Sequence, residues 1–283
     1  MNIFQIHDIC KDKLGVIDYL QRQNILHVDV QCGPCEQKCT LIKQSAKLSG
    51  YLWRCKKCKK KQSVLKDSFL ENAGISPAKF VYIVFYWATR IPLQATMQHI
   101  AISTHTGVDY FRFLRDICSW KLLSTTIQLG GPGKEVQIDV SLQVNAVFRR
   151  DRNVEMWVFG AYDVEEKVGY VTYVSERDAA TLLPIIQKVV MPGSVIISDE
   201  WASYRDISNM PENYQHRIVN QVNGGHTNNV QTYCRRANAS FKRRSKDLIQ
   251  GHLHEFMWRE RFGSTFDLAY LNILRHISER YPC

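Results

Sequence analysis

The sequence predicts an α/β fold in which a mixed β-sheet carries helices on its faces, preceded by a helical segment and a small cysteine-rich segment. Three observations predict it. Five of the nine cysteines fall between residues 32 and 58. Residues 63–125 have the apolar spacing of helices, and segments after a glycine-rich linker at 129–134 alternate as strands do. At roughly 150 residues per domain, the 283 residues predict two domains, or one large domain with an appendage.

The composition excludes several classes of protein. Apolar residues make up 45% of the chain and charged residues 23%, which excludes a mostly disordered chain and a coiled coil. The longest apolar run, Phe80–Ala88, has nine residues, whereas a membrane span needs about 20. Residues 1–20 lack a signal pattern. We therefore expect a soluble protein that is not secreted and has no disulfide framework.

Positive charge is concentrated in two stretches without acidic residues. The net charge is +10, and residues 38–66 hold ten Lys or Arg while residues 235–246 hold six. Clustered positive charge is typical of proteins that bind a polyanion, most often nucleic acid, because each phosphate contact releases counterions. A solvated surface is the other interpretation of the same pattern.

The cysteines have the spacing of a metal site. After a helical lead-in at 1–31, residues 32–62 are expected to form a zinc ribbon, because two CxxC pairs can offer four thiolates to a tetrahedral Zn²⁺. The expected ligands are Cys32, Cys35, Cys55 and Cys58. Cys39 is a spare that could replace Cys35. Zinc would stabilise a segment too small for a core of its own.

Lysines surround the second CxxC pair. They would face phosphates, although a solvated loop fits the same residues. These lysines are Lys56, Lys57, Lys59, Lys60 and Lys61.

Residues 63–128 are interpreted as a helical DNA-binding segment. Pro77 suits a first helical position after a turn. Residues 93–115 fit a helix-turn-helix, with a short helix over 93–100 and a second helix, capped by Ser103 or Thr104, running to about Trp120. Such a second helix can lie in the major groove, but a bundle without DNA contacts fits equally. The candidate exposed positions are His105, Thr106, Asp109 and Arg112, and Arg112 is the expected DNA contact.

Residues 134–263 are expected to form the sheet domain. The expected strands are 135–142, 156–164, 170–175, 194–198 and one near 216–220. The expected helices are 179–190, a small one near 201–205, and a long one from Thr227 towards Arg244. Residues 264–283 are expected to form a C-terminal tail.

Two aspartates lie where the strands predict a metal site. Asp139 is in the middle of one strand, and Asp199 follows the end of another. A carboxylate on a central strand is costly unless it is paired or binds a metal. Two such acids could bind Mg²⁺ and help to position an oxygen nucleophile and a leaving group, whereas unrelated surface aspartates are the alternative. A third carboxylate usually follows on a helix, yet residues 213–246 contain no Asp or Glu.

An ordered set of motifs carries a family resemblance. The motifs are Val136–Asp139, Trp157–Gly160, Thr181–Gln187, Pro192–Trp201, His226–Asn228 and Glu255–Arg259. Over about residues 32–263, the chain resembles Merlin-type eukaryotic DNA transposases, which are related to ISXO-like transposases of bacterial insertion sequences. The resemblance implies a zinc ribbon, a helical DNA-binding segment and an RNase H-like catalytic domain. It also implies a carboxylate triad that uses Mg²⁺ or Mn²⁺ to nick transposon ends and join them to target DNA.

The resemblance assigns the triad residue by residue, with one departure. Asp139 matches the first acid and Asp199 the second, but Gln231 stands where the third acid is usual. An amide oxygen can ligate Mg²⁺ without adding charge, and some relatives use Asn there. Losing ~3–4 kcal/mol of transition-state stabilisation would slow the reaction about 10²–10³-fold. Glu200 and Glu135 are nearby acids, and neither is expected to substitute.

Further departures cluster around the same site. The family usually has Glu where this chain has Val140, and Trp where it has Cys234. The loop at 220–225 is short, and Gln221 replaces an expected His.

Three hypotheses follow. The first is a transposase-derived DNA-binding protein whose strand transfer is impaired at Gln231. The second is an active Mg²⁺-dependent transposase, and the third is a zinc-ribbon interaction or scaffold protein without a DNA role. The expected partners are double-stranded DNA and further copies of this chain, without a membrane, and the expected location is the nucleus. The expected DNA contacts beside the third position are Arg235, Arg236, Lys242, Arg243 and Arg244.

Overall fold

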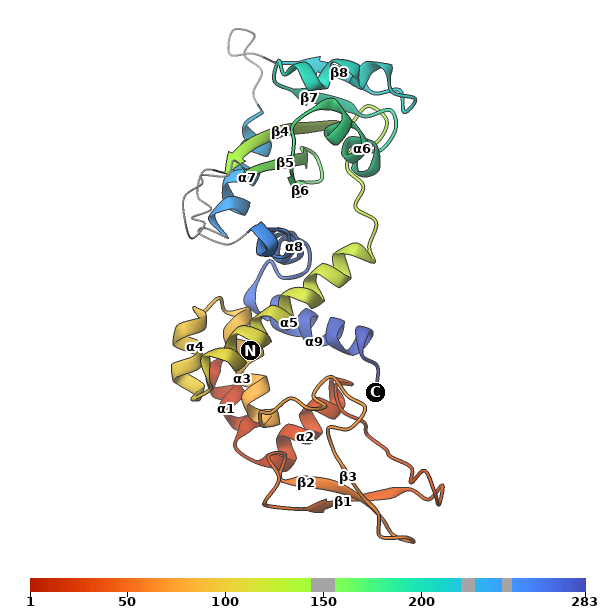
Figure 1. The fold of residues 1–283 in the computed structure, drawn as a ribbon, viewed down its shortest axis with the longest axis vertical. Coiled ribbons are helices and arrows are strands. Elements are labelled where there is room, and N and C mark those ends of the chain that lie inside the picture. Colours follow the sequence, from red (N-terminus) through yellow and green to blue (C-terminus); the bar gives the residue numbers. More distant parts are fainter. Residues whose placement is uncertain (144–155, 220–226, 241–245) are drawn as a thin grey trace. The chain divides into compact units, whose positions relative to one another are not determined.

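The computed structural model describes residues 1–143, 156–219, 227–240 and 246–283 (Figure 1). They divide into two compact units. Unit 1 comprises Met1–Ile117 and Phe262–Cys283, and unit 2 comprises Cys118–Arg261, so unit 2 is inserted in the sequence of unit 1. Within the described ranges, no helix combines the length and apolar character needed to cross a membrane.

Unit 1 is mainly helical. Asn2, Asp12, Ser76 and Thr265 each cap the helix that follows, accepting a backbone N–H three residues on. Pro77 occupies the first turn of its helix, as predicted. The helices are α1 (Ile3–Cys10), α2 (Lys13–Arg22), α3 (Pro77–Ala88), α4 (Leu93–Ile100), α5 (Thr104–Leu123), which continues into unit 2, and α9 (Phe266–Arg280).

The predicted C-terminal tail, residues 264–283, contains α9. One side of this helix is buried in unit 1 and includes Ala269, Ile273 and Leu274. The Tyr270 hydroxyl lies 2.9 Å from the Tyr19 hydroxyl of α2. Helix α9 is therefore part of the core of unit 1.

The two helices expected for the helix-turn-helix are α4 and α5. Helix α4 ends at Ala101, whose left-handed backbone (φ 49°) turns the chain. Gly107 lets α5 pack closely on α4, because an added Cβ would lie 2.7 Å from Cγ of Met97. Arg112 is exposed on α5, and exposed His105 forms an ion pair of 2.9 Å with Asp109.

Unit 1 also contains a small antiparallel sheet within residues 32–62 and just beyond. Its strands are β1 (Cys39–Lys43), β2 (Tyr51–Cys55) and β3 (Lys61–Ser63), in that spatial order. Cys39 is opposite Cys55, and Trp53 is opposite Gln62. This sheet brings the two CxxC segments to one end.

Unit 2 is built on a five-stranded mixed sheet in the order β6-β5-β4-β7-β8 (Figure 1). Strand β5 is antiparallel to its neighbours β6 and β4, and β7 and β8 continue the sheet in parallel with β4. The strands are β4 (Glu135–Gln143), β5 (Met156–Asp163), β6 (Val168–Val174), β7 (Val195–Ser198) and β8 (Gln215–Ile218). The mixed α/β fold is confirmed.

The helical elements of unit 2 follow the prediction in part. They are α6 (Ala179–Val189), the 3-10 helix η1 (Ala202–Asn209), α7 (Asn228–Ala239) and α8 (Lys246–Phe262). The helix expected from Thr227 towards Arg244 is α7, which ends at Ala239, and residues 241–245 lie outside the described residues. Helix α8 was not predicted.

The two faces of the sheet have different neighbours. Val136 and Ile138 point into an apolar core with Leu182 and Ile186 of α6. Gln137 and Asp139 point to the other face because side chains alternate along a strand. There α7 packs, and Val230 and Tyr233 are buried.

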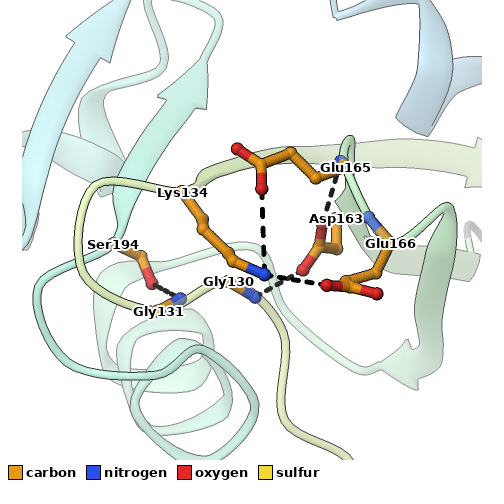
Figure 2. A network of polar contacts seen from close by, with 7 residues as sticks. All are labelled: Gly130, Gly131, Lys134, Asp163, Glu165, Glu166 and Ser194. Atoms are coloured by element: carbon orange, nitrogen blue, oxygen red, sulfur yellow. Dashed lines mark hydrogen bonds and ion pairs between the residues drawn. The ribbon is translucent and has the colours of Figure 1, made fainter.

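Buried polar groups fix the glycine-rich linker to the amino end of β4 (Figure 2). The Asp163 carboxylate is 2% exposed and accepts N–H groups of Gly130, Glu165 and Glu166 at 2.8–3.0 Å. Ser194 accepts the N–H of Gly131 at 2.9 Å. Gly130 has φ +78°, and an added Cβ would lie 2.5 Å from the Ser194 hydroxyl oxygen. The linker is thus a fixed part of unit 2.

Asp163→Ala is expected to lower the free energy of unfolding of unit 2 by about 2–4 kcal/mol, because three partly buried backbone N–H groups lose a charged acceptor. The measurement is urea unfolding of the full chain. Glu165→Ala is the matched control, since Glu165 is 57% exposed and pairs with Lys134 at 3.7 Å. That variant should change stability by less than about 1 kcal/mol. Equal effects of the two variants would contradict the assignment.

Candidate functional site

Two carboxylates lie side by side, one in the middle of β4 and the other directly after the end of β7. These strands are parallel neighbours, with Glu135 opposite Val195 and Gln137 opposite Ile197. Continuing that register by two residues sets Asp139 opposite Asp199, just after β7 ends. Residues in register on parallel strands point to the same face, so both carboxylates are directed to the face that carries α7.

The surroundings of the pair favour a bound cation. Burial raises the pKa of Asp139 to about 6, and the negative charge of Asp199 adds to the rise. Burial also raises the pKa of Asp199. A positive ion between the two groups would remove the repulsion and the cost of burying charge. Carboxylate oxygens are the ligands that Mg²⁺ prefers, so the donor set fits a divalent ion.

A buried tyrosine adjoins the pair. Tyr204 of η1 is 1% exposed, and among the described residues its hydroxyl has no hydrogen-bond partner. Burial raises its pKa, and the charges of Asp139 and Asp199 raise it further. The phenol therefore keeps its proton.

Helix α7 is seated on β4 by a side chain that the sequence analysis missed. The side-chain amide oxygen (Oε1) of Gln137 accepts the backbone N–H groups of Asn229 and Val230 at 3.1 and 3.3 Å, at the start of the helix. The only signal for this role was a polar residue two positions before Asp139 in an apolar alternation. The contact fixes the first turn of α7, which carries position 231, against the strand of Asp139.

Two glycines let α7 approach the sheet closely. An added Cβ at Gly160 would lie 2.3 Å from the Cys234 sulfur, and one at Gly169 would lie 2.4 Å from the Tyr233 ring. Gly160 is directly opposite Asp139 on β5. Cys234 thus fills the space beside the first acid, where the resembling family usually has Trp.

Gln231 is exposed on α7, one helical turn before Cys234. Its amide nitrogen donates to the Thr227 hydroxyl at 3.0 Å. This leaves the amide oxygen without a partner among the described residues. Position 231 therefore carries a neutral amide, not a carboxylate, on the helix that packs against β4.

The two acids considered as replacements have other surroundings. Glu135 forms an ion pair with Arg217 at 3.1 Å, and it lies four residues before Asp139, or roughly 13 Å along the strand. Glu200 is exposed in the segment after β7. Val140 points to the opposite face and packs against the core, so it does not enter the site. Gln221 and residues 220–225 lie outside the described residues.

The comparisons with known proteins bear on this domain. Residues 140–263 match the family model of the ISXO2-like transposase domain, starting one residue after Asp139. This match supports a DDE transposase family. No curated protein matches the chain.

The chain is also similar to solved integrase structures. The catalytic core domain of HTLV-2 integrase in complex with magnesium (trimeric form) has 11% identity and a TM-score of 0.32, covering 45% of this chain and 84% of that chain. The simian T-cell lymphotropic virus intasome in complex with PP2A regulatory subunit B56 gamma has 12% identity and a TM-score of 0.34. That match covers 63% of this chain and 67% of that chain.

The four predicted zinc ligands come together in unit 1, outside the transposase-like domain. Their sulfur atoms all lie within 4.8 Å of one another, and the sulfurs of Cys32 and Cys58 are 3.4 Å apart. A tetrahedral Zn²⁺ with Zn–S bonds of about 2.3 Å needs sulfur separations of about 3.8 Å, so the group fits. It consists of Cys32, Cys35, Cys55 and Cys58. Cys39 is not in it.

Backbone N–H groups of the second CxxC turn support a thiolate. The Lys60 N–H donates to the Cys58 sulfur, and this bond is the main reason that the pKa of Cys58 falls to about 7. Burial raises the pKa of Cys32 to about 12. The lysines expected to face phosphates are exposed around this turn: Lys56, Lys57, Lys59, Lys60 and Lys61.

The arginines predicted beside the third position differ in their contacts. Arg235 is exposed and donates to the Thr232 hydroxyl at 3.0 Å. Arg236 forms two bonds of 2.7 Å to the carboxylate of Glu260 on α8, so its guanidinium already has an anionic partner. Lys242, Arg243 and Arg244 lie outside the described residues.

Proposed function

We propose that this chain is a transposase-derived, DNA-binding protein of the DDE type whose strand transfer is impaired at Gln231. The register of β4 and β7 carries the proposal, because it sets Asp139 and Asp199 side by side. Helix α7 brings a neutral third residue to the same face of the sheet. The domain match supports the reaction class, which is cleavage and joining of phosphodiester bonds in double-stranded DNA.

The two carboxylates would hold Mg²⁺ or Mn²⁺ through their oxygens. The bound ion supplies positive charge for the phosphate under attack. In a nicking step, a water oxygen bonds to phosphorus, a P–O bond of the backbone breaks, and the released oxygen takes a proton. Asp139 and Asp199 provide two negatively charged ligands in fixed positions, since one lies within a strand and the other directly after one.

Gln231 lowers the negative charge that the site offers to divalent ions. Its amide can offer an oxygen but no negative charge, so two divalent ions would face only two carboxylates. A loss of ~3–4 kcal/mol of transition-state stabilisation corresponds to a rate about 10²–10³-fold lower. DNA binding does not depend on this charge, and we propose that it persists.

An active Mg²⁺-dependent transposase is the second candidate. One observation favours it: the Gln231 amide nitrogen is held by Thr227, which leaves the amide oxygen available as a ligand. The third hypothesis is a zinc-ribbon scaffold without a DNA role. The two basic stretches argue against it.

Finer assignments belong to the same proposal. We propose an RNase H-like class for the domain, supported by the strand order β6-β5-β4-β7-β8 with antiparallel first strands. The residue motifs support a Merlin-type relationship and, with it, a nuclear location. Joining two transposon ends needs more than one active site, which supports a homo-oligomer. Zn²⁺ is the proposed structural metal, and Mg²⁺ or Mn²⁺ the catalytic one.

DNA binding and nicking by the full chain test the proposal. We expect duplex DNA to bind with an affinity that falls as salt rises, with a slope of about −0.9 for each phosphate contacted. Nicking of supercoiled DNA with Mg²⁺ or Mn²⁺ should be weak, and Asp199→Ala should abolish it. Absence of DNA binding, or binding that salt does not affect, would support the scaffold reading instead. Fast wild-type nicking that requires Asp199 would support the active transposase.

A further inference from the structure

An arginine is held between two tryptophans at the edge of the sheet where β4 and β7 end. The Arg177 guanidinium carbon lies 4.1 Å from the Trp157 ring centroid and 4.0 Å from the Trp201 ring centroid. Two rings cannot both stack at that distance on one side of a planar group, so the guanidinium lies between them. Each contact is favourable and restricts the side chain.

The backbone of Arg177 is fixed as well. Its carbonyl oxygen accepts the Trp201 indole N–H at 3.3 Å and the Ser203 hydroxyl at 2.8 Å. The backbone N–H of Trp201 donates to the carbonyl oxygen of Asp199 at 2.9 Å. The arginine and the second acid of the carboxylate pair are therefore joined through one short segment.

The N–H groups at the edge of the Arg177 guanidinium are available to a ligand. Among the described residues, no carboxylate or carbonyl accepts a hydrogen bond from it. The next residue, Asp178, uses its carboxylate to cap α6 through the Thr181 N–H at 2.9 Å. A half-buried cation with five N–H donors and no protein acceptor is suited to an anion, and the planar fork matches a phosphate.

The position of this arginine relates it to the carboxylates. Trp157 is at the start of β5, Arg177 follows β6 and Trp201 follows β7. Because β5 is antiparallel to β4 while β6 and β7 run with β4, all three lie at the edge where β4 and β7 end. Trp157 is three residues from Gly160, so it points to the face opposite Asp139. Ligands of α/β sheets gather at such an edge, next to the strand where the order reverses.

We infer that Arg177, held by Trp157 and Trp201, binds a backbone phosphate of the DNA strand next to the phosphate that the carboxylates engage. This inference rests on the proposed DNA-binding function and names a specific residue for it. The two indoles fix the plane of the fork, so little side-chain freedom is lost when the phosphate binds. Neither the basic stretches nor the triad motif includes this residue.

The test compares charge-removing variants of the full, zinc-loaded chain on a duplex of about 20 base pairs. Arg177→Gln should weaken binding about tenfold and make the slope of log affinity against log salt shallower by about 0.9. Lys188→Gln is the matched control, because Lys188 is exposed at the far end of α6. It should change affinity by less than about twofold. Arg177→Lys keeps the charge but loses the fork, so its affinity should fall several-fold with the slope unchanged.

A merely structural role gives a different pattern. If Arg177 only positions Trp201 and Asp199, Arg177→Gln would lower the affinity for Mn²⁺ in a titration and leave the salt slope unchanged, which would overturn the inference. Wild-type affinity and slope in a folded Arg177→Gln protein would overturn it too, while leaving the proposed function intact. A wild-type chain that binds no duplex would overturn both. Thermal unfolding of each variant establishes folding, and Arg177→Lys decides the outcome if Arg177→Gln does not fold.

Discussion

Gln231→Glu is expected to raise Mg²⁺-dependent nicking of supercoiled DNA about 10²–10³-fold above the wild-type rate. The reason is geometric. Gln137 fixes the first turn of α7 on β4, so a carboxylate at position 231 would join two acids already in register. Glu is nearly the same size as Gln, and residue 231 is exposed, so the substitution should not disturb packing. The measurement is the initial rate of relaxation of supercoiled plasmid.

Two control variants separate charge from shape. Gln231→Asn keeps an amide and should show no gain. Gln231→Glu combined with Asp199→Ala should lose the gain, because the new acid works only with the pair. If the wild-type rate equals that of Gln231→Glu, the amide is a sufficient ligand. If neither protein nicks, Cys234, which departs from the family beside the first acid, becomes the next residue to revert.

Removal of zinc is expected to unfold the ribbon. Structural zinc sites in small domains bind with about 10–16 kcal/mol, which exceeds what so small a sheet gains from its own core. The purified chain should contain one zinc, and Cys55→Ala should lose it together with protection of residues 32–62 from proteolysis. The measurements are metal content and limited proteolysis with and without a chelator.

Cys39→Ala is the matched control for the zinc prediction. Cys39 and Cys55 are cross-strand partners, and both are buried. They differ in that only Cys55 belongs to the cluster of four sulfurs. Cys39→Ala should therefore retain zinc. Loss of zinc in both variants would mean that burial, rather than ligation, determines metal content.

Features whose chemistry is tied to short spacing were predictable from the sequence. The two CxxC pairs predicted a cysteine cluster, and the helix start at Pro77, the short helix over 93–100 and the next helix start near Ser103 or Thr104 agree with the structure within a residue. Alternation after the linker predicted the strands of the mixed sheet. The neighbouring positions of Asp139 and Asp199 followed from the same strands.

Features that depend on distant contacts were not predicted. Helix α8 was missed, and α9 was interpreted as a tail, because an amphipathic helix near a chain end gives no sign of the core that it joins. Arg177 had no signal, since its importance comes from two rings supplied by separate strands. The only signal for the role of Gln137 was its polar side chain in an apolar alternation. The roles of Gln231 and of the basic residues stay predictions.

The inserted arrangement of unit 2 affects the order in which the protein is made. The ribosome releases the first helices and the ribbon early, but Tyr270 and Ile273 of α9, which complete their core, emerge after the whole sheet domain. Unit 2 can therefore fold before unit 1 has completed its core, while apolar side chains of unit 1 are still exposed. This order is the reverse of the usual one, in which the N-terminal part folds first. A premature stop shortly before α9 would spare the carboxylate pair and instead destabilise the unit that begins at residue 1.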